Sequence, residues 1–222
     1  KKDGSLLTNG GVEIPTVGRR FVWESFHAQS VRIIEAVIKR GGFVNYRSGQ
    51  HYHILAGYLS QDKTDRRIEI SDLEKPMPEI IGSNVHQIFR RYELALYWIM
   101  SAGSSEDSLT RWSKFRQPIF SYSAVTSRLS EVIQQMGGAI EKNGKYASNN
   151  WAYSRFAPDG AVTTFHIENR IADAVLSPTV TTAWAALLCA MVLKAVDFSQ
   201  YGILEVGDRD FIKKATEAYP SL

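Results

Sequence analysis

Trp151-Ala-Tyr-Ser-Arg-Phe-Ala157 is followed by Pro158-Asp-Gly160 and then by Ala161-Val-Thr-Thr-Phe-His-Ile167. Apolar and polar residues alternate in the first and third of these segments, which is the pattern of strands with two different faces. The segment between them favours a turn, because proline presets the first turn dihedral and glycine accepts the positive φ that follows. The stretch therefore predicts an antiparallel β-hairpin.

Helical patterns dominate the rest of the chain. Apolar residues recur at three- and four-residue steps over 22–40, and Gly41-Gly42 supplies a stop. Ser83 is expected to cap a second helix that Gly103 ends, because a serine side chain accepts hydrogen bonds from the amides of a first turn. Further elements are expected as follows: a hairpin over 43–60, strands over 67–70 and 202–206, and helices over 123–136, from Pro178 and from Asp208.

These elements predict an α+β protein, predominantly helical with one or two β-hairpins, because the strands come as hairpins and not as βαβ units. The length of 222 residues suits a single compact domain, and a chain of this size buries about 70% of the surface that it exposes when unfolded. Residues 1–18 show no regular period and are expected to form an irregular N-terminal arm. Residues 19–222 are expected to form the globular α+β domain.

The one cysteine, Cys189, lies in an apolar run and is expected to pack as a small buried hydrophobe. A single cysteine cannot form a disulfide framework, which favours a reducing, cytoplasmic or otherwise intracellular location. The apolar run over 183–196 is shorter than the roughly 20 residues of a membrane span. We expect it to form a buried core helix, and we expect no membrane span.

Motifs for phosphate-loop, dinucleotide and serine-hydrolase sites are missing from the sequence, which predicts no catalytic residue, no metal and no cofactor. His51 and His53 flank Tyr52 on an expected strand and share one face. They could bind zinc with a third ligand, but packing as half-buried strand histidines is the more common outcome. Asp159 and Glu168 resemble the acidic pair of a metal-dependent nuclease, but the strand between them spans roughly 20 Å, too far to share one metal.

The net charge is only +3, but basic residues are concentrated between positions 109 and 156, a segment that contains seven basic residues and two acidic ones. They are interleaved with aromatic residues, which suits nucleic acid because the cations contact phosphates while an aromatic ring stacks on a base. On the expected strand, residues 151, 153 and 155 share one face. The opposing interpretation is ordinary packing, with aromatic residues in a core and arginine stems over them. The candidate nucleic-acid-binding residues are Arg111, Trp112, Lys114, Arg116, Trp151, Tyr153 and Arg155.

The function that this pattern favours is a non-enzymatic protein that binds RNA or single-stranded nucleic acid and forms a homo-oligomer. A nucleocapsid or coat subunit would have this mildly basic, aromatic-rich composition without a catalytic motif. One alternative is a small hydrolase or metal-dependent nuclease whose site is assembled from dispersed residues. A second alternative is a structural or adaptor domain that uses Trp112 or Trp151 as an interface anchor.

Overall fold

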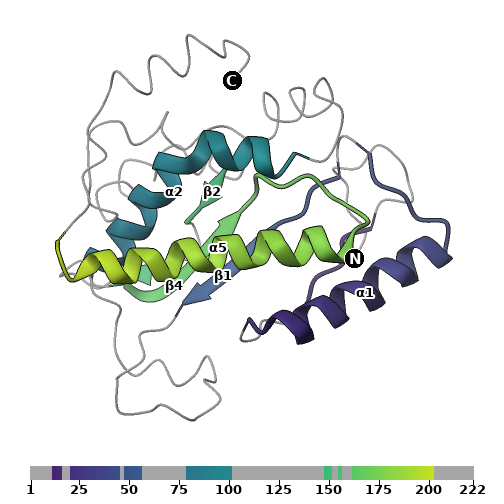
Figure 1. Ribbon diagram of the computed structural model, residues 1–222, viewed down its shortest axis with the longest axis horizontal. Helices are drawn as coiled ribbons and strands as arrows, with labels where there is room; N and C mark the ends of the chain where they lie inside the picture. The colour runs from purple at the N-terminus through teal and green to yellow at the C-terminus, as the bar shows by residue number, and fades with distance from the viewer. Residues whose placement is uncertain are drawn as a thin grey trace, which may run out of the picture.

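The computed structural model describes residues 12–16, 21–45, 48–56, 79–101, 148–151, 155–156 and 162–202. Within these residues, long helices accompany a small antiparallel sheet (Figure 1). The elements are α1 (Trp23–Lys39), β1 (Tyr52–Ala56), α2 (Glu79–Ile99), β2 (Asn149–Asn150), β3 (Arg155–Phe156), β4 (Val162–Asn169) and α5 (Pro178–Ser199). The α+β class predicted from the sequence is therefore confirmed.

The predicted first helix is confirmed as α1, and it ends at the predicted glycine pair. Gly41 has a φ of 71°, a conformation that glycine adopts without strain, and its N–H donates to the carbonyl of Ile38 at 2.9 Å. Gly42 lies so close to the last turn that a Cβ there would be 2.5 Å from Cγ1 of Val37. The two glycines therefore end the helix and let the chain pack back against it.

The predicted helix from Pro178 is also confirmed, as α5. Ser177 has an extended backbone and its Oγ accepts a hydrogen bond from the N–H of Val180 at 3.4 Å, while Pro178 occupies the first turn. The helix has 22 residues and is long and apolar enough to cross a membrane by length and composition, a test that the core helix of a soluble protein also passes. Within its most apolar stretch 44% of the residues are buried inside the protein, so part of the helix surface packs against other elements and part does not.

The predicted start of the second helix was wrong. α2 begins at Glu79, four residues before Ser83, and ends at Ile99. Ser83 therefore lies inside the helix, where it is completely buried. Gly103, the predicted end, lies outside the described residues.

The sheet is organised around β4, which lies between β1 and β2 and also pairs with β3. All of these pairings are antiparallel. The antiparallel pairing of β3 with β4 agrees with the predicted hairpin at residues 155–156, while Trp151 carries no strand and residues 152–154 and 157–161 lie outside the described residues. The strand partner expected for the segment after Gly49 was wrong, because β1 pairs with β4 and not with residues 43–45, which carry no strand.

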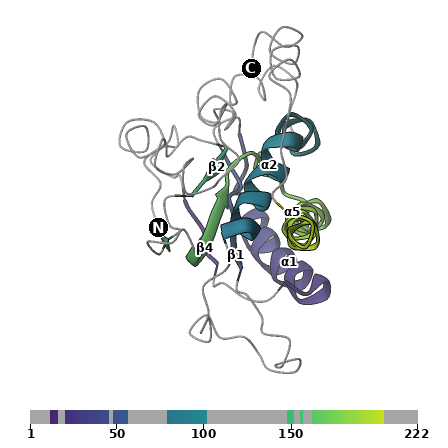
Figure 2. The same cartoon turned by 90° about the vertical axis from the view of Figure 1, so that its left-hand side faces the viewer.

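The described helices lie on one side of the sheet, and α5 packs against both α1 and α2 (Figure 2). α2 and α5 run antiparallel, since Asn84 near the start of α2 donates to Ser199 Oγ at 3.1 Å at the end of α5. Tyr52 joins the layers by donating its hydroxyl proton to the carbonyl of Thr181 at 2.9 Å. The core between the layers includes the buried side chains of Phe89, Leu96, Trp151, Ile167 and Leu188. Among the described residues, no helix covers the opposite face of the sheet.

Several predicted elements lie outside the described residues. These are the strand over 67–70, the strand over 202–206 apart from Gly202, the helix over 123–136, and the helix from Asp208. Of the predicted arm over 1–18, only residues 12–16 are described. Val12 and Ile14 are 60% and 49% exposed there, so this part of the segment is not packed into the core.

α2 buries polar side chains as well as apolar ones. His86 is completely buried, with its ring edge toward Trp151 at 6.3 Å between ring centroids. Within the described part of the chain, neither ring nitrogen of His86 has a hydrogen-bond partner. Burial and the nearby charge of Arg90 lower the pKa of His86 from its ordinary value of 6.5 to about 3. The imidazole is therefore neutral in the folded protein over the physiological pH range.

The lowered pKa of His86 predicts a loss of stability in mild acid. Below pH 6.5 the unfolded chain protonates this imidazole while the folded protein does not, so the free energy of unfolding falls until the folded pKa of about 3 is reached. We expect a loss of roughly 2 kcal/mol between about pH 7 and pH 5, measured by urea unfolding.

A His86→Leu variant should lose this share of the pH dependence, whereas His27→Asn, on the partly exposed side of α1, should retain it. Equal slopes of stability against pH in wild type and His86→Leu would show that His86 does not titrate on unfolding.

Candidate functional site

The polar face of the sheet gathers residues from strands that are far apart in the sequence. Side chains alternate along a strand, so Tyr52 and Ile167 point toward the helices while their neighbours His53, His166 and Glu168 point to the other face. Glu168 lies directly opposite His53 on β1 and Asn150 on β2. We call the set His51, His53, Asn150, His166, Glu168 and Arg170 the histidine cluster.

Glu168 is the centre of the histidine cluster. Its Oε1 lies 3.0 Å from Nδ1 of His51 and also accepts a hydrogen bond from the Arg170 guanidinium. Its Oε2 accepts a hydrogen bond from Nδ2 of Asn150 at 3.0 Å. The Glu168 side chain is only 5% exposed, so these three neighbours hold the carboxylate in one orientation.

The neighbours of Glu168 keep it ionised. Burial by itself would raise its pKa, but the hydrogen bond from His51, the charge of Arg170 and the hydrogen bond from Asn150 outweigh burial. Together they lower the pKa of Glu168 to about 2. A carboxylate that is charged at every physiological pH can orient an imidazole and stabilise its protonated form.

A second contact joins two imidazoles across the strands. Nδ1 of His53 lies 2.8 Å from Nε2 of His166, so one ring donates a proton to the other, which accepts. Burial and the nearby His53 lower the pKa of His166, while Glu168 acts to raise it. The net lowering favours a neutral His166 that can accept from His53.

The histidine cluster is reachable from solvent. The side chains of His51 and His53 are 29% and 47% exposed, while Glu168 and Arg170 lie deeper. Exposed imidazoles around a fixed carboxylate and a guanidinium can donate hydrogen bonds to an anion and can exchange protons with a bound ligand. In the residues that the structure describes, no three His, Cys, Asp or Glu side chains are placed to hold a metal ion.

Most of the nucleic-acid-binding residues predicted from the sequence lie outside the described residues, namely Arg111, Trp112, Lys114, Arg116 and Tyr153. Trp151 is described and is a core residue, 1% exposed. A buried ring has no open face for a base to stack on, so in this structure Trp151 serves packing.

Arg155 lies in β3, where its backbone pairs with Thr164, two residues from His166 on β4. Residues 152–154 lie outside the described residues, so the expectation that residues 151, 153 and 155 share one face is not tested.

The sequence contains a signal for the histidine cluster that matches no recognised motif. His51 and His53 alternate along one strand, and His166, Glu168 and Arg170 alternate along another. The sequence did not indicate that these strands are neighbours. The proposed acidic pair is not tested, because Asp159 lies outside the described residues.

Comparison with known protein families, with curated proteins and with solved structures finds no match to this chain. The histidine cluster is therefore the main structural basis for a functional proposal.

The position of Glu168 predicts that Glu168→Gln lowers the free energy of unfolding at neutral pH by about 1–3 kcal/mol, because Arg170 and His51 lose a charged acceptor. The effect should fade in acid: the folded pKa of about 2 lies below the ordinary 4.5, so the stability from Glu168 is complete above pH 4.5 and is lost toward pH 2. Chemical unfolding at several pH values measures this difference.

Glu35→Gln on the exposed side of α1 is the matched control and should change stability little at any pH. A wild-type minus Glu168→Gln difference that stays constant from neutral pH to strong acid would contradict the ion pairing described above.

Proposed function

We propose that the protein binds RNA or another single-stranded nucleic acid through the sheet face that carries the histidine cluster, and that it associates with copies of itself, as a nucleocapsid or coat subunit does. The observation that carries the proposal is the exposed pair His51 and His53 beside Arg170 on a sheet face that no described helix covers. Imidazole and guanidinium N–H groups are donors to phosphate oxygens.

The distribution of charge supports the same surface. The basic segment over 109–156 ends in β2 and β3, the strands that pair with β4 beside the histidine cluster. Arg155 is the last basic residue of that segment, and its backbone pairs with β4 two residues from His166. Glu168 is already paired with Arg170 and His51, so its charge is largely compensated where a phosphate would approach.

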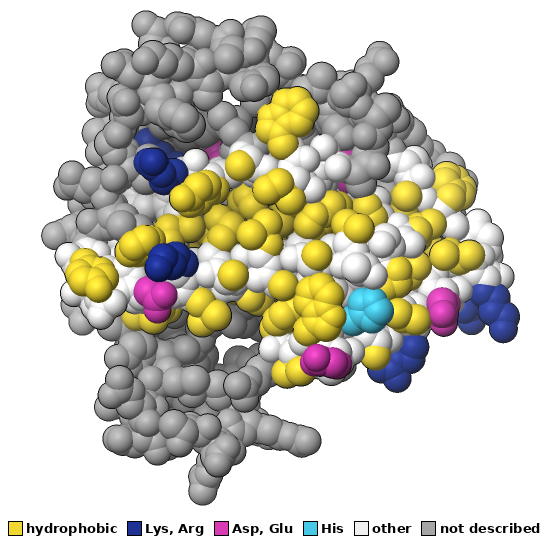
Figure 3. Space-filling model, in the orientation of Figure 1, with side chains coloured by type: hydrophobic (Ala, Val, Ile, Leu, Met, Phe, Trp, Pro, Cys, Tyr) yellow, Lys and Arg dark blue, Asp and Glu magenta, His cyan; other side chains and the backbone are white. Residues whose placement is uncertain are grey.

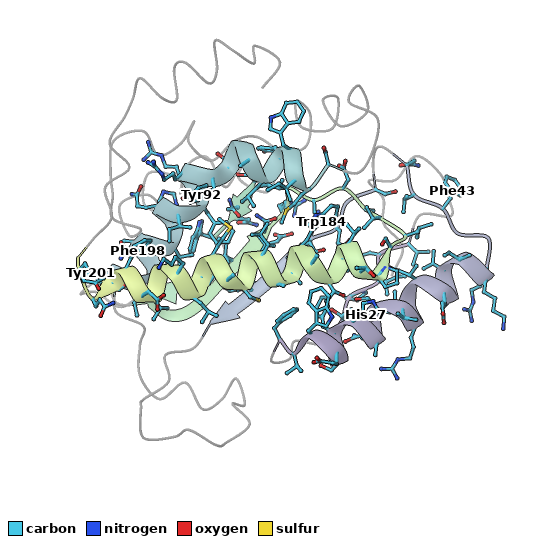
Figure 4. All side chains as sticks on the ribbon, viewed as in Figure 1. His27, Phe43, Tyr92, Trp184, Phe198 and Tyr201 are labelled. Carbon is cyan, nitrogen blue, oxygen red and sulfur yellow. The ribbon has the colours of Figure 1, made fainter. Side chains whose placement is uncertain are left out.

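Self-association is supported by apolar side chains on the outer surface of the helical layer. Figure 3 shows hydrophobic side chains across the outer side of α5 and toward α2. Leu193 on α5 is 67% exposed and Trp98 on α2 is 54% exposed. Tyr92 and Tyr201, which Figure 4 labels beside Phe198, are 51% and 82% exposed. Large exposed apolar areas on a folded protein mark interaction surfaces.

Binding to a single-stranded oligonucleotide should weaken steeply with salt, because phosphate contacts release counterions. If Arg111, Lys114, Arg116 and Arg155 each neutralise one phosphate, the logarithm of the affinity should fall with the logarithm of the salt concentration with a slope of about −3. Changing both Arg111 and Arg116 to Ala should reduce the steepness of this slope by roughly 1.4 units. Fluorescence anisotropy of a labelled oligouridine measures both values.

The control for this experiment changes Arg32 and Arg40, exposed arginines of the α1 region, to Ala. That double variant should keep the wild-type slope. Absence of measurable binding at about 50 mM salt would refute the nucleic-acid part of the proposal, since nonspecific binding is strongest at low salt.

If the outer face of α5 joins copies of the chain, Leu193→Asp should lower the oligomeric mass, because association would bury a carboxylate without a partner. Multi-angle light scattering at micromolar concentration measures the mass, and circular dichroism checks that the domain remains folded. Arg40→Asp introduces the same side chain at an exposed polar position and should leave the mass unchanged.

Deletion of residues 1–18 distinguishes this surface from the expected N-terminal arm, because an irregular arm with little to bury itself against can also dock on a neighbouring copy. A loss of mass on deletion alone would assign association to the arm and not to α5. A monomeric full-length protein, with or without nucleic acid, would refute self-association.

A further inference from the structure

We propose that the histidine cluster is an acid–base centre that cleaves the phosphodiester backbone of bound RNA by attack of the ribose 2′-hydroxyl, with His51 as the general base and His53 as the general acid. This inference rests on the proposed function, because it assigns a reaction to the nucleic acid bound at the same sheet face.

The geometry of His51 suits a general base. Its Nδ1 lies 3.0 Å from the ionised Glu168, so Nδ1 carries the proton that the carboxylate accepts. In this tautomer the basic lone pair is on Nε2 of a ring that is 29% exposed. Arg170 and Asn150 fix the carboxylate, which stabilises the imidazolium that forms when His51 takes a proton.

The geometry of His53 suits a general acid. His53 follows His51 by two positions along extended backbone, so both side chains lie on the same face and their Cα atoms are about 7 Å apart. One phosphate with a hydrogen bond on each side can fill this span. A protonated His53 donates Nδ1–H to Nε2 of His166 at 2.8 Å. Its Nε2 lies 4.0 Å from Glu168, and the side chain is 47% exposed, so a leaving oxygen can reach it.

The reaction balances without a metal or a redox partner. His51 takes the proton of the 2′-hydroxyl while the 2′-oxygen forms a bond to phosphorus. The bond from phosphorus to the 5′-oxygen breaks, and His53 gives its proton to that oxygen. The products are a 2′,3′-cyclic phosphate and a 5′-hydroxyl, and proton exchange with water restores both histidines. Arg170 contacts the same oxygen of Glu168 as His51 does, and a guanidinium at this end of the cluster can stabilise the negative charge that the phosphoryl group gains.

The test incubates the full chain with a labelled single-stranded RNA in the presence of EDTA. We expect cleavage that leaves 2′,3′-cyclic phosphate ends, identified by mass spectrometry, and no cleavage of DNA of the same sequence, because DNA lacks the nucleophile. A single 2′-deoxy substitution should block cleavage at that position alone. The rate should follow a bell-shaped dependence on pH, since one histidine must be neutral and the other protonated.

His51→Asn and His53→Asn should each lower the cleavage rate by about 10²–10⁴-fold, the usual contribution of a general base or acid. Each variant also loses one hydrogen-bond donor to phosphate, so its affinity for the uncleavable DNA oligonucleotide should fall by up to about tenfold, far less than the loss of cleavage rate. His27→Asn, on α1, is the matched control and should cleave at the wild-type rate. Circular dichroism and purification alongside wild type exclude unfolding and a contaminating nuclease.

Several outcomes would overturn the assignment. Binding of RNA without cleavage removes the acid–base centre but leaves the proposed binding function in place, whereas absence of both binding and cleavage removes both. Cleavage that EDTA abolishes, that affects DNA equally or that survives in His51→Asn and His53→Asn shows that a different site or chemistry is responsible.

Discussion

The antiparallel pairing of β1 with β4 is the constraint on which the described structure depends. It joins distant segments, since the side chains of His53 and His166, which form a hydrogen bond across the two strands, are 113 residues apart in the chain. On one face the pairing places Tyr52 and Ile167 beneath α5 and α2, where they form part of the core. On the other face the same register sets His53 opposite Glu168, and both the core and the histidine cluster therefore depend on one strand pairing.

The helical layer distributes its polar and apolar residues unusually. α2 buries His86, Glu93 and Asn84, and it exposes Tyr92 and Trp98. Glu93 contacts Ser148 and Asn84 contacts Ser199, whereas neither ring nitrogen of His86 has a hydrogen-bond partner among the described residues. Tyr92 and Trp98, in contrast, are 51% and 54% exposed. A helix of this kind is suited to a protein whose outer surface meets another copy in an assembly.

The two faces of the molecule therefore support separate parts of one proposed role. The sheet face that no described helix covers has imidazoles, a guanidinium and a compensated carboxylate, which are groups that suit the proposed contact with an anionic backbone. The outer helical face has apolar side chains, which can bind another protein surface. Trp151, predicted to stack on bases, instead packs between these two faces. Because Trp151 is buried, the nucleic-acid proposal rests on the histidine cluster and the basic segment and not on aromatic stacking.

The sequence by itself determined the α+β class, α1 and its glycine stop, the start of α5 at Pro178 and the hairpin that includes β4. These features were predictable because their causes are local: helical period, capping, a turn and strand alternation. The tertiary structure alone decided that β1 pairs with β4, that α2 begins before Ser83, and that Glu168 meets His51 and Arg170. Strand partners distant in sequence leave no local pattern, and a buried polar helix such as α2 depends on the residues that surround it. The candidate site was therefore visible in the sequence only as two separate alternations, which one strand pairing brings together.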